Sequence, residues 1–89
     1  MSSTRRPGVR VQCGVARFKA RRRIEEVLDK HGLNHVGLAK RLGVSQQAVS
    51  ATIGGTRHSP VVLDGLRNLG VPERYLYDPR LVKPEQLVA

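Results

Sequence analysis

Two adjacent glutamines near the middle of the chain, Gln46 and Gln47, are the side chains best suited to specific chemistry. A carboxamide carries a donor beside an acceptor, so it can bond to both N6 and N7 of adenine in the major groove of DNA. Ser45 precedes the pair, and Ser50 and Ala51 follow it with a hydroxyl and a methyl group that can contact base edges. These five residues are the candidate base-reading set. The alternative is that the glutamines are solvated helix formers.

The charge of the chain points to an anionic partner. Sixteen Lys and Arg against seven Asp and Glu give a net charge of +9, and no acid occurs between Asp29 and Asp64. Residues 1–23 hold eight of the cations and no acid, so residues 1–14 are expected to form a flexible basic arm. Its arginines are Arg5, Arg6 and Arg10. The arm can bind phosphate, or it can be a solubilising tail.

Several other kinds of site are not expected from the residues present. Cys13 is the single cysteine, so an intrachain disulfide and a cysteine zinc cluster are both excluded. His31 and His35 have the spacing of two metal ligands, but Gly32 interrupts the helix between them. We find no nucleophile with a base and no glycine-rich phosphate loop, so neither an enzyme, a metal site nor a cofactor is expected. No apolar stretch is long enough to span a membrane, and a reducing cytoplasm is the expected location.

The elements that must position the glutamines are helices. Apolar residues at helical spacing predict five short helices, at about 15–30, 35–42, 46–53, 60–69 and 72–76. Asn34, Ser45 and Ser59 stand at the expected N-caps, and Gly43 permits a tight turn. The expected fold is an all-α compact bundle, with a helix-turn-helix domain over residues 15–78 and a C-terminal tail over residues 79–89.

Residues 35–50, with the sequence HVGLAKRLGVSQQAVS, resemble the helix-turn-helix of the phage repressor and Cro family of transcription regulators. The pair Leu38-Ala39, the turn residue Gly43 and the hydrophobe Val49 match that family's motif. The resemblance implies that a recognition helix at about 45–53 enters the major groove and that the glutamines read bases. It also implies phosphate contacts at both ends of that helix, from Asn34, His35, Arg57 and His58. The chain departs from the family at Thr52, where a large hydrophobe is usual.

These observations favour sequence-specific binding of double-stranded DNA by a phage or prophage-type repressor or Cro-like regulator. The resemblance implies a homodimer on paired half-sites, and Val71, Tyr75, Leu76 and Leu81 are the candidate interface. The expected location is the nucleoid, with no membrane partner. The alternative is an antitoxin-type module that binds operator DNA and also a protein partner.

Overall fold

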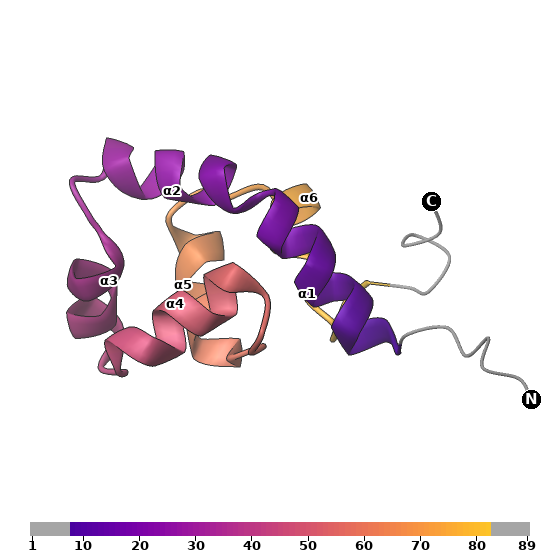
Figure 1. Ribbon diagram of the computed structural model, residues 1–89. Helices are drawn as coiled ribbons and strands as arrows, with labels where there is room; N and C mark the ends of the chain where they lie inside the picture. The colour runs from indigo at the N-terminus through magenta and orange to yellow at the C-terminus, as the bar shows by residue number, and fades with distance from the viewer. Residues whose placement is uncertain (1–7, 83–89) are drawn as a thin grey trace, which may run out of the picture.

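Residues 8–82 are described by the structure, a computed structural model, and they fold into helices without any strand (Figure 1). The helices are α1 (Val9–Lys19), α2 (Arg21–Lys30), α3 (His35–Leu42), α4 (Gln46–Gly54), α5 (Pro60–Asn68) and α6 (Glu73–Leu76). The expectation of a small all-α bundle is therefore confirmed.

Local capping signals set the boundaries of the middle helices. The side chain of Asn34 accepts the Gly37 N–H at 2.8 Å, and that of Ser45 accepts the Ala48 N–H at 3.1 Å. Each satisfies an amide that the first turn of a helix leaves free. Gly43 ends α3 at φ 71°, a backbone conformation that suits glycine. The predicted limits of α3, α4 and α5 agree with the structure to within one residue.

The first part of the chain differs from the prediction. The single helix expected at 15–30 is two helices with a break at Ala20, and the first begins at Val9. Residues 9–14 are thus helical rather than part of a flexible arm, and Cys13 and Gly14 are buried. The buried positions of α1 are Cys13, Gly14 and Arg17, so the buried face of this helix is not the apolar face on which the sequence prediction relied. Arg5, Arg6 and residues 83–89 of the expected tail lie outside the described residues.

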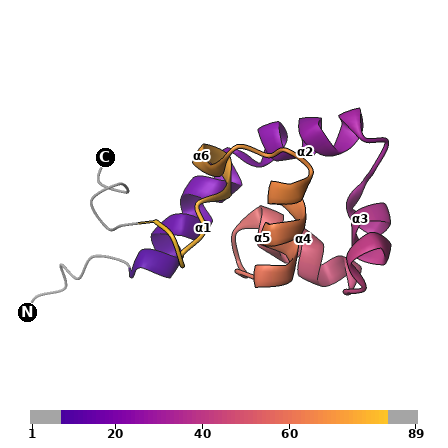
Figure 2. The same ribbon diagram turned by 180° about the vertical axis from the view of Figure 1, so that it is seen from behind.

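The core is formed by apolar side chains from every helix except α1. Figure 2 shows α5 lying across α4 on the side hidden in Figure 1, and both helices contribute to this core. Its buried members are Ile24, Leu28, Leu38, Ala39, Val49, Ile53, Val62, Leu63, Leu66, Val71 and Leu76. Because Val71 and Leu76 are buried within the chain, the expected dimer interface is wrong at these two positions. Tyr75 also packs against the core, which leaves only Leu81 of the four exposed.

A buried arginine joins α1 to this core. Arg17 has no exposed surface, and its guanidinium donates to backbone carbonyl oxygens and to one imidazole. The acceptors are the carbonyls of Thr52 (2.7 Å), Leu76 (2.9 Å), Tyr77 (3.1 Å) and Arg57 (3.1 Å), and Nδ1 of His58. Carbonyls at the ends of helices have no partner within the helix. Arg17 therefore donates to carbonyls near the ends of α4 and α6 at once, and the Thr52 carbonyl also accepts the Gly55 N–H at 3.2 Å.

Backbone contact between two glycines fixes the other side of α1. A methyl group built on Gly14 would overlap the carbonyl of Gly55, and one built on Gly55 would overlap the carbonyl of Gly14. Gly55 ends α4 with φ 91°, a conformation that side chains disfavour. Helix α1 therefore packs directly on the C-terminal end of α4.

Asp78 holds the segment after α6 on α5. Its carboxylate is 1% exposed and accepts hydrogen bonds from Arg80 Nη2 at 2.7 Å and Arg67 Nη2 at 3.2 Å. Arg80 also donates its backbone N–H to this carboxylate at 3.0 Å. Burial by itself raises the pKa of Asp78, but the hydrogen bonds from Arg80 and Arg67 lower it to about 2.

We expect Asp78 to make the fold sensitive to acid. A carboxylate with a depressed pKa stabilises the fold above its unfolded pKa, and that contribution is lost as pH falls from about 4 towards 2. The expected loss is about 2 kcal/mol in the free energy of unfolding. Urea unfolding at several pH values should show this fall in the wild type and a smaller one in Asp78→Asn. Glu26→Gln, which removes an exposed carboxylate, should keep the wild-type fall; parallel curves for wild type and Asp78→Asn would contradict the assignment.

Candidate nucleic-acid interface

Helices α3 and α4 form a helix-turn-helix. They are joined by residues 43–45 and pack on each other (Figure 1), and Leu38, Ala39 and Val49 belong to the same buried core. Val44 donates its N–H to the carbonyl of Ala39 at 3.0 Å, which closes the turn.

The two glutamines are presented on the first turn of α4. Gln46 and Gln47 are exposed, and Ala51 lies one turn further along, partly exposed. Ser45 and Ser50 have partners within the chain: the Ser45 hydroxyl caps α4, and the Ser50 hydroxyl lies 2.8 Å from Nδ1 of His35. The structure thus brings the glutamines and Ala51 to one accessible surface, while both serines also serve the fold.

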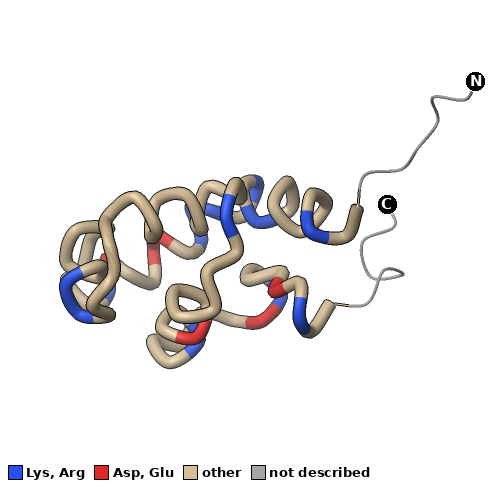
Figure 3. The backbone as a smooth tube through the Cα atoms, turned by 90° about the horizontal axis from the view of Figure 1, so that it is seen from below, with Lys and Arg blue, Asp and Glu red and all other residues tan. Residues whose placement is uncertain are grey.

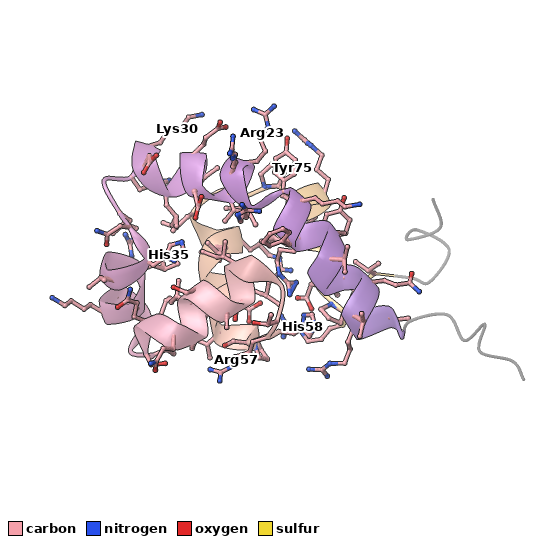
Figure 4. All side chains as sticks on the ribbon, viewed as in Figure 1. Arg23, Lys30, His35, Arg57, His58 and Tyr75 are labelled. Atoms are coloured by element: carbon pink, nitrogen blue, oxygen red, sulfur yellow. The ribbon has the colours of Figure 1, made fainter. Side chains whose placement is uncertain are left out.

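His35 occupies a different environment from the one expected of a phosphate contact. Its ring lies between α3 and α4 (Figure 4), with Nδ1 at Ser50 and Nε2 at 3.1 Å from a carboxylate oxygen of Glu25. Both ring nitrogens are therefore occupied, and the neighbouring carboxylate repels anions. His35 links three helices. Asn34 beside it is exposed, and its amide nitrogen remains able to donate while its oxygen caps α3.

Arg57 and His58 follow α4 but differ in character. Arg57 is exposed and points away from the helices (Figure 4), and no carboxylate among residues 8–82 pairs with it. His58 is partly buried and accepts a hydrogen bond from Arg17. Burial lowers the pKa of His58, and the nearby charges of Arg17 and Arg10 lower it further. A neutral His58 is a partner of the buried arginine, whereas Arg57 is free to bind phosphate.

The charge is distributed unevenly over the helices. Figure 3 shows acidic positions on α2 and from α5 onward, and none on α3 or α4. The acids of the α5–α6 side are engaged with two arginines: Asp64 pairs with Arg67 and Arg80, and Glu73 pairs with Arg67. Lys40 and Arg41, on α3, are exposed. Among the described helices, α1 and α3 carry Lys or Arg without any acid on the same helix, and α4 carries neither.

Two residues of structural importance were not identified from the sequence. Arg17 was counted among the cations of a basic run, and nothing local distinguishes it from its exposed neighbours. Thr52, where the resembled family has a large hydrophobe, is fully buried; its hydroxyl donates to the Ala48 carbonyl at 2.7 Å, and its own carbonyl accepts from Arg17. The available signal in the sequence was Thr52 itself, a polar residue at a position where the resembled family has a large hydrophobe.

Other possible sites in the described chain are few. Cys13 is buried, and burial raises the pKa of its thiol, as suits an incidental cysteine. Among residues 8–82, no three His, Cys, Asp or Glu side chains gather where they could hold a metal ion. None of the helices from α1 to α6 has the length and apolar character needed to cross a membrane.

Comparison of the chain with protein-family models, with curated proteins and with solved structures gives no match.

Proposed function

We propose that this chain binds double-stranded DNA sequence-specifically, as a transcription regulator of the repressor or Cro type. The observation that carries the proposal is the exposure of Gln46 and Gln47 at the start of the second helix of a helix-turn-helix. In this arrangement the first helix braces and the N-terminal residues of the second reach base edges in the major groove.

Each part of the motif has a definite role in the proposal. Helix α3 supports α4, and the Ser45 cap defines where α4 begins. Gln46 and Gln47 read adenine through paired hydrogen bonds, and the Ala51 methyl contacts a thymine methyl. Arg57, beyond the other end of α4, binds a backbone phosphate and so fixes the register of the helix in the groove. Two copies of the chain bind paired half-sites about one helical turn apart.

Selection of bound duplexes from a random DNA library tests this function. The wild-type chain should enrich a short shared motif that contains A·T pairs, repeated in inverted orientation about 10 base pairs apart. The control is the double variant Gln46→Ala with Gln47→Ala, which should recover no such motif. A wild-type pool as random as that of the variant would contradict the proposal.

The arginines at the start of the chain are expected to add affinity without specificity. Since α1 begins at Val9 and Cys13 is buried, a deletion that keeps the fold is limited to residues 2–7. Removing Arg5 and Arg6 should weaken binding to all duplexes and flatten the slope of log K against log salt by up to about two units.

The full-length variant Arg5→Ala with Arg6→Ala is the matched control for the deletion, because it removes the same charge and keeps the chain length. It should reproduce both effects, with the ranking of DNA sequences unchanged. An unchanged salt slope in both variants would contradict a phosphate-binding role.

A further inference from the structure

Helix α1 exposes an apolar stripe that the proposed DNA contact does not use. Val11, Val15 and Phe18 recur at i, i+4 and i+7, which places them on one face of the helix. Their exposed fractions are 57%, 52% and 48%. Three large apolar side chains in a row on one helix form a continuous patch, which marks an interaction surface more than scattered exposed residues do.

This stripe forms one wall of a groove. The other wall is the segment from the end of α4 towards α5, residues 54–58, and the groove has a volume of about 640 Å³. Gly14, Gly54 and Gly55 also line it. The backbones of Gly14 and Gly55 are in contact and join the two walls, and no side chain of these glycines enters the groove.

The groove is rimmed by positive charge. Among residues 8–82, Arg10 and Arg57 both line it, no acidic side chain does, and neither arginine has an ion pair. The guanidinium of Arg21 lies over the Phe18 ring, 4.0 Å from its centre, and adds a third charge at the far end of the stripe. The lowered pKa of His58, caused by burial and then by Arg17 and Arg10, is consistent with a positive environment.

Charge complementarity decides between the possible occupants. A second copy of this chain, packed stripe against stripe, would bring one set of these arginines towards the other, which is unfavourable. A helix with apolar residues on one face and carboxylates along its edges would instead fill the stripe and pair with the arginines. Helix α1 has 11 residues, or about 16 Å, enough to contact about three turns of such a helix.

We infer that the groove between α1 and residues 54–58 binds an amphipathic helix of a partner protein, with an apolar stripe flanked by Asp and Glu. This is helix-in-groove recognition, in which apolar anchors at i, i+4 and i+7 supply the affinity. The glutamines lie at the other end of α4 from Gly54 and Gly55, so the apolar stripe is separate from the proposed base-reading surface, and Arg57 is the residue that both proposals use.

A designed peptide provides the test. The probe is a fluorescein-labelled 16-residue helix with leucines at i, i+4, i+7 and i+11 and glutamates beside them; its control carries lysines in place of the glutamates. Fluorescence anisotropy with the full chain should show micromolar binding of the glutamate peptide, weakened by salt, and no binding of the lysine peptide. Val15→Ser and Phe18→Ser should each weaken binding tenfold or more, whereas Val61→Ser, an equally exposed valine on α5, should not.

The outcomes that would overturn the inference are distinct. Equal binding of the two peptides, or full binding by Val15→Ser, would remove the basis for an acidic partner. A dimer in sedimentation that Phe18→Ser dissociates would assign the stripe to self-association. A tenfold gain in peptide affinity on deletion of residues 83–89 would show that the chain's own C-terminus fills the groove. DNA binding by Val15→Ser, measured in parallel, separates these outcomes from failure of the proposed function, because Val15 has no part in the DNA contact.

Discussion

A Gly55→Ala substitution is expected to lower the free energy of unfolding by about 2 to 5 kcal/mol. Two effects add: the left-handed backbone conformation at φ 91° costs a side chain about 1 to 2 kcal/mol, and overpacking costs about 1 to 3 kcal/mol. The overlap is with the Gly14 carbonyl, which belongs to the backbone of α1 and cannot rotate away. A domain of this size has only about 5 to 15 kcal/mol of stability in total.

The neighbouring glycine is the matched control. A methyl group on Gly54 would meet nothing within 4 Å, and Gly54 is helical, so Gly54→Ala should leave the stability unchanged or raise it slightly. Gly14→Ala meets the same backbone contact without the strained φ, and it therefore isolates the overpacking effect. Urea unfolding of the three variants provides the measurement. Equal stability of the Gly54 and Gly55 variants would show that α1 does not pack on the end of α4.

An Arg17→Met substitution is expected to cost about 3 to 5 kcal/mol. Methionine fills much of the space, but it removes the Arg17 donors from the carbonyls of Leu76 and Tyr77 and one of the two donors from that of Thr52, which keeps the Gly55 N–H. Each unsatisfied buried carbonyl costs about 1 to 3 kcal/mol, and partial relaxation reduces the sum. Arg17→Lys should be nearly as damaging, because an ammonium group cannot reproduce the planar fork of donors that spans two helix ends.

Arg22→Met is the control for this prediction, since Arg22 is an exposed cation on the adjacent helix. It should change the stability by less than about 0.5 kcal/mol. Thermal and urea unfolding of the variants would give the comparison. Equal stability of Arg17→Met and Arg22→Met would mean that the carbonyls around Arg17 have access to water. The hydrogen bonds from Arg17 to α4 and α6 would then not stabilise the fold.

Local signals made the helix-turn-helix predictable, whereas long-range contacts defined the rest. The caps at Asn34 and Ser45 and the turn at Gly43 act within a few residues, so the sequence contains them in full. The first turns of α1 and its separation from α2 were not predicted, because Arg17 is buried only through carbonyls 35 to 60 residues away. The same reason explains Val71: its burial depends on how the chain folds back after α5.

In the candidate site, too, the features set by neighbouring residues could be predicted, and those set by distant residues could not. The exposure of Gln46 and Gln47 could be predicted from the sequence, because the helical spacing of the apolar residues in α4 leaves the glutamines outside the buried face. The roles of the two histidines depend on partners outside the motif: His35 faces Glu25 of α2, and His58 faces Arg17 of α1. Neither partner is adjacent in the sequence, so a flanking histidine could not be distinguished from a phosphate contact without the fold.

The most direct test of the account is a comparison of Gln46→Ala and Gln47→Ala with Arg57→Ala. Each should be titrated at several salt concentrations on a selected duplex and on its scrambled version. The glutamine variants should lose about 1 to 3 kcal/mol on the selected duplex and little on the scrambled one, with the salt slope kept. Arg57→Ala should weaken binding to both duplexes and reduce the slope by about one. If both glutamine variants kept the wild-type discrimination between the duplexes, α4 would not be the element that reads DNA.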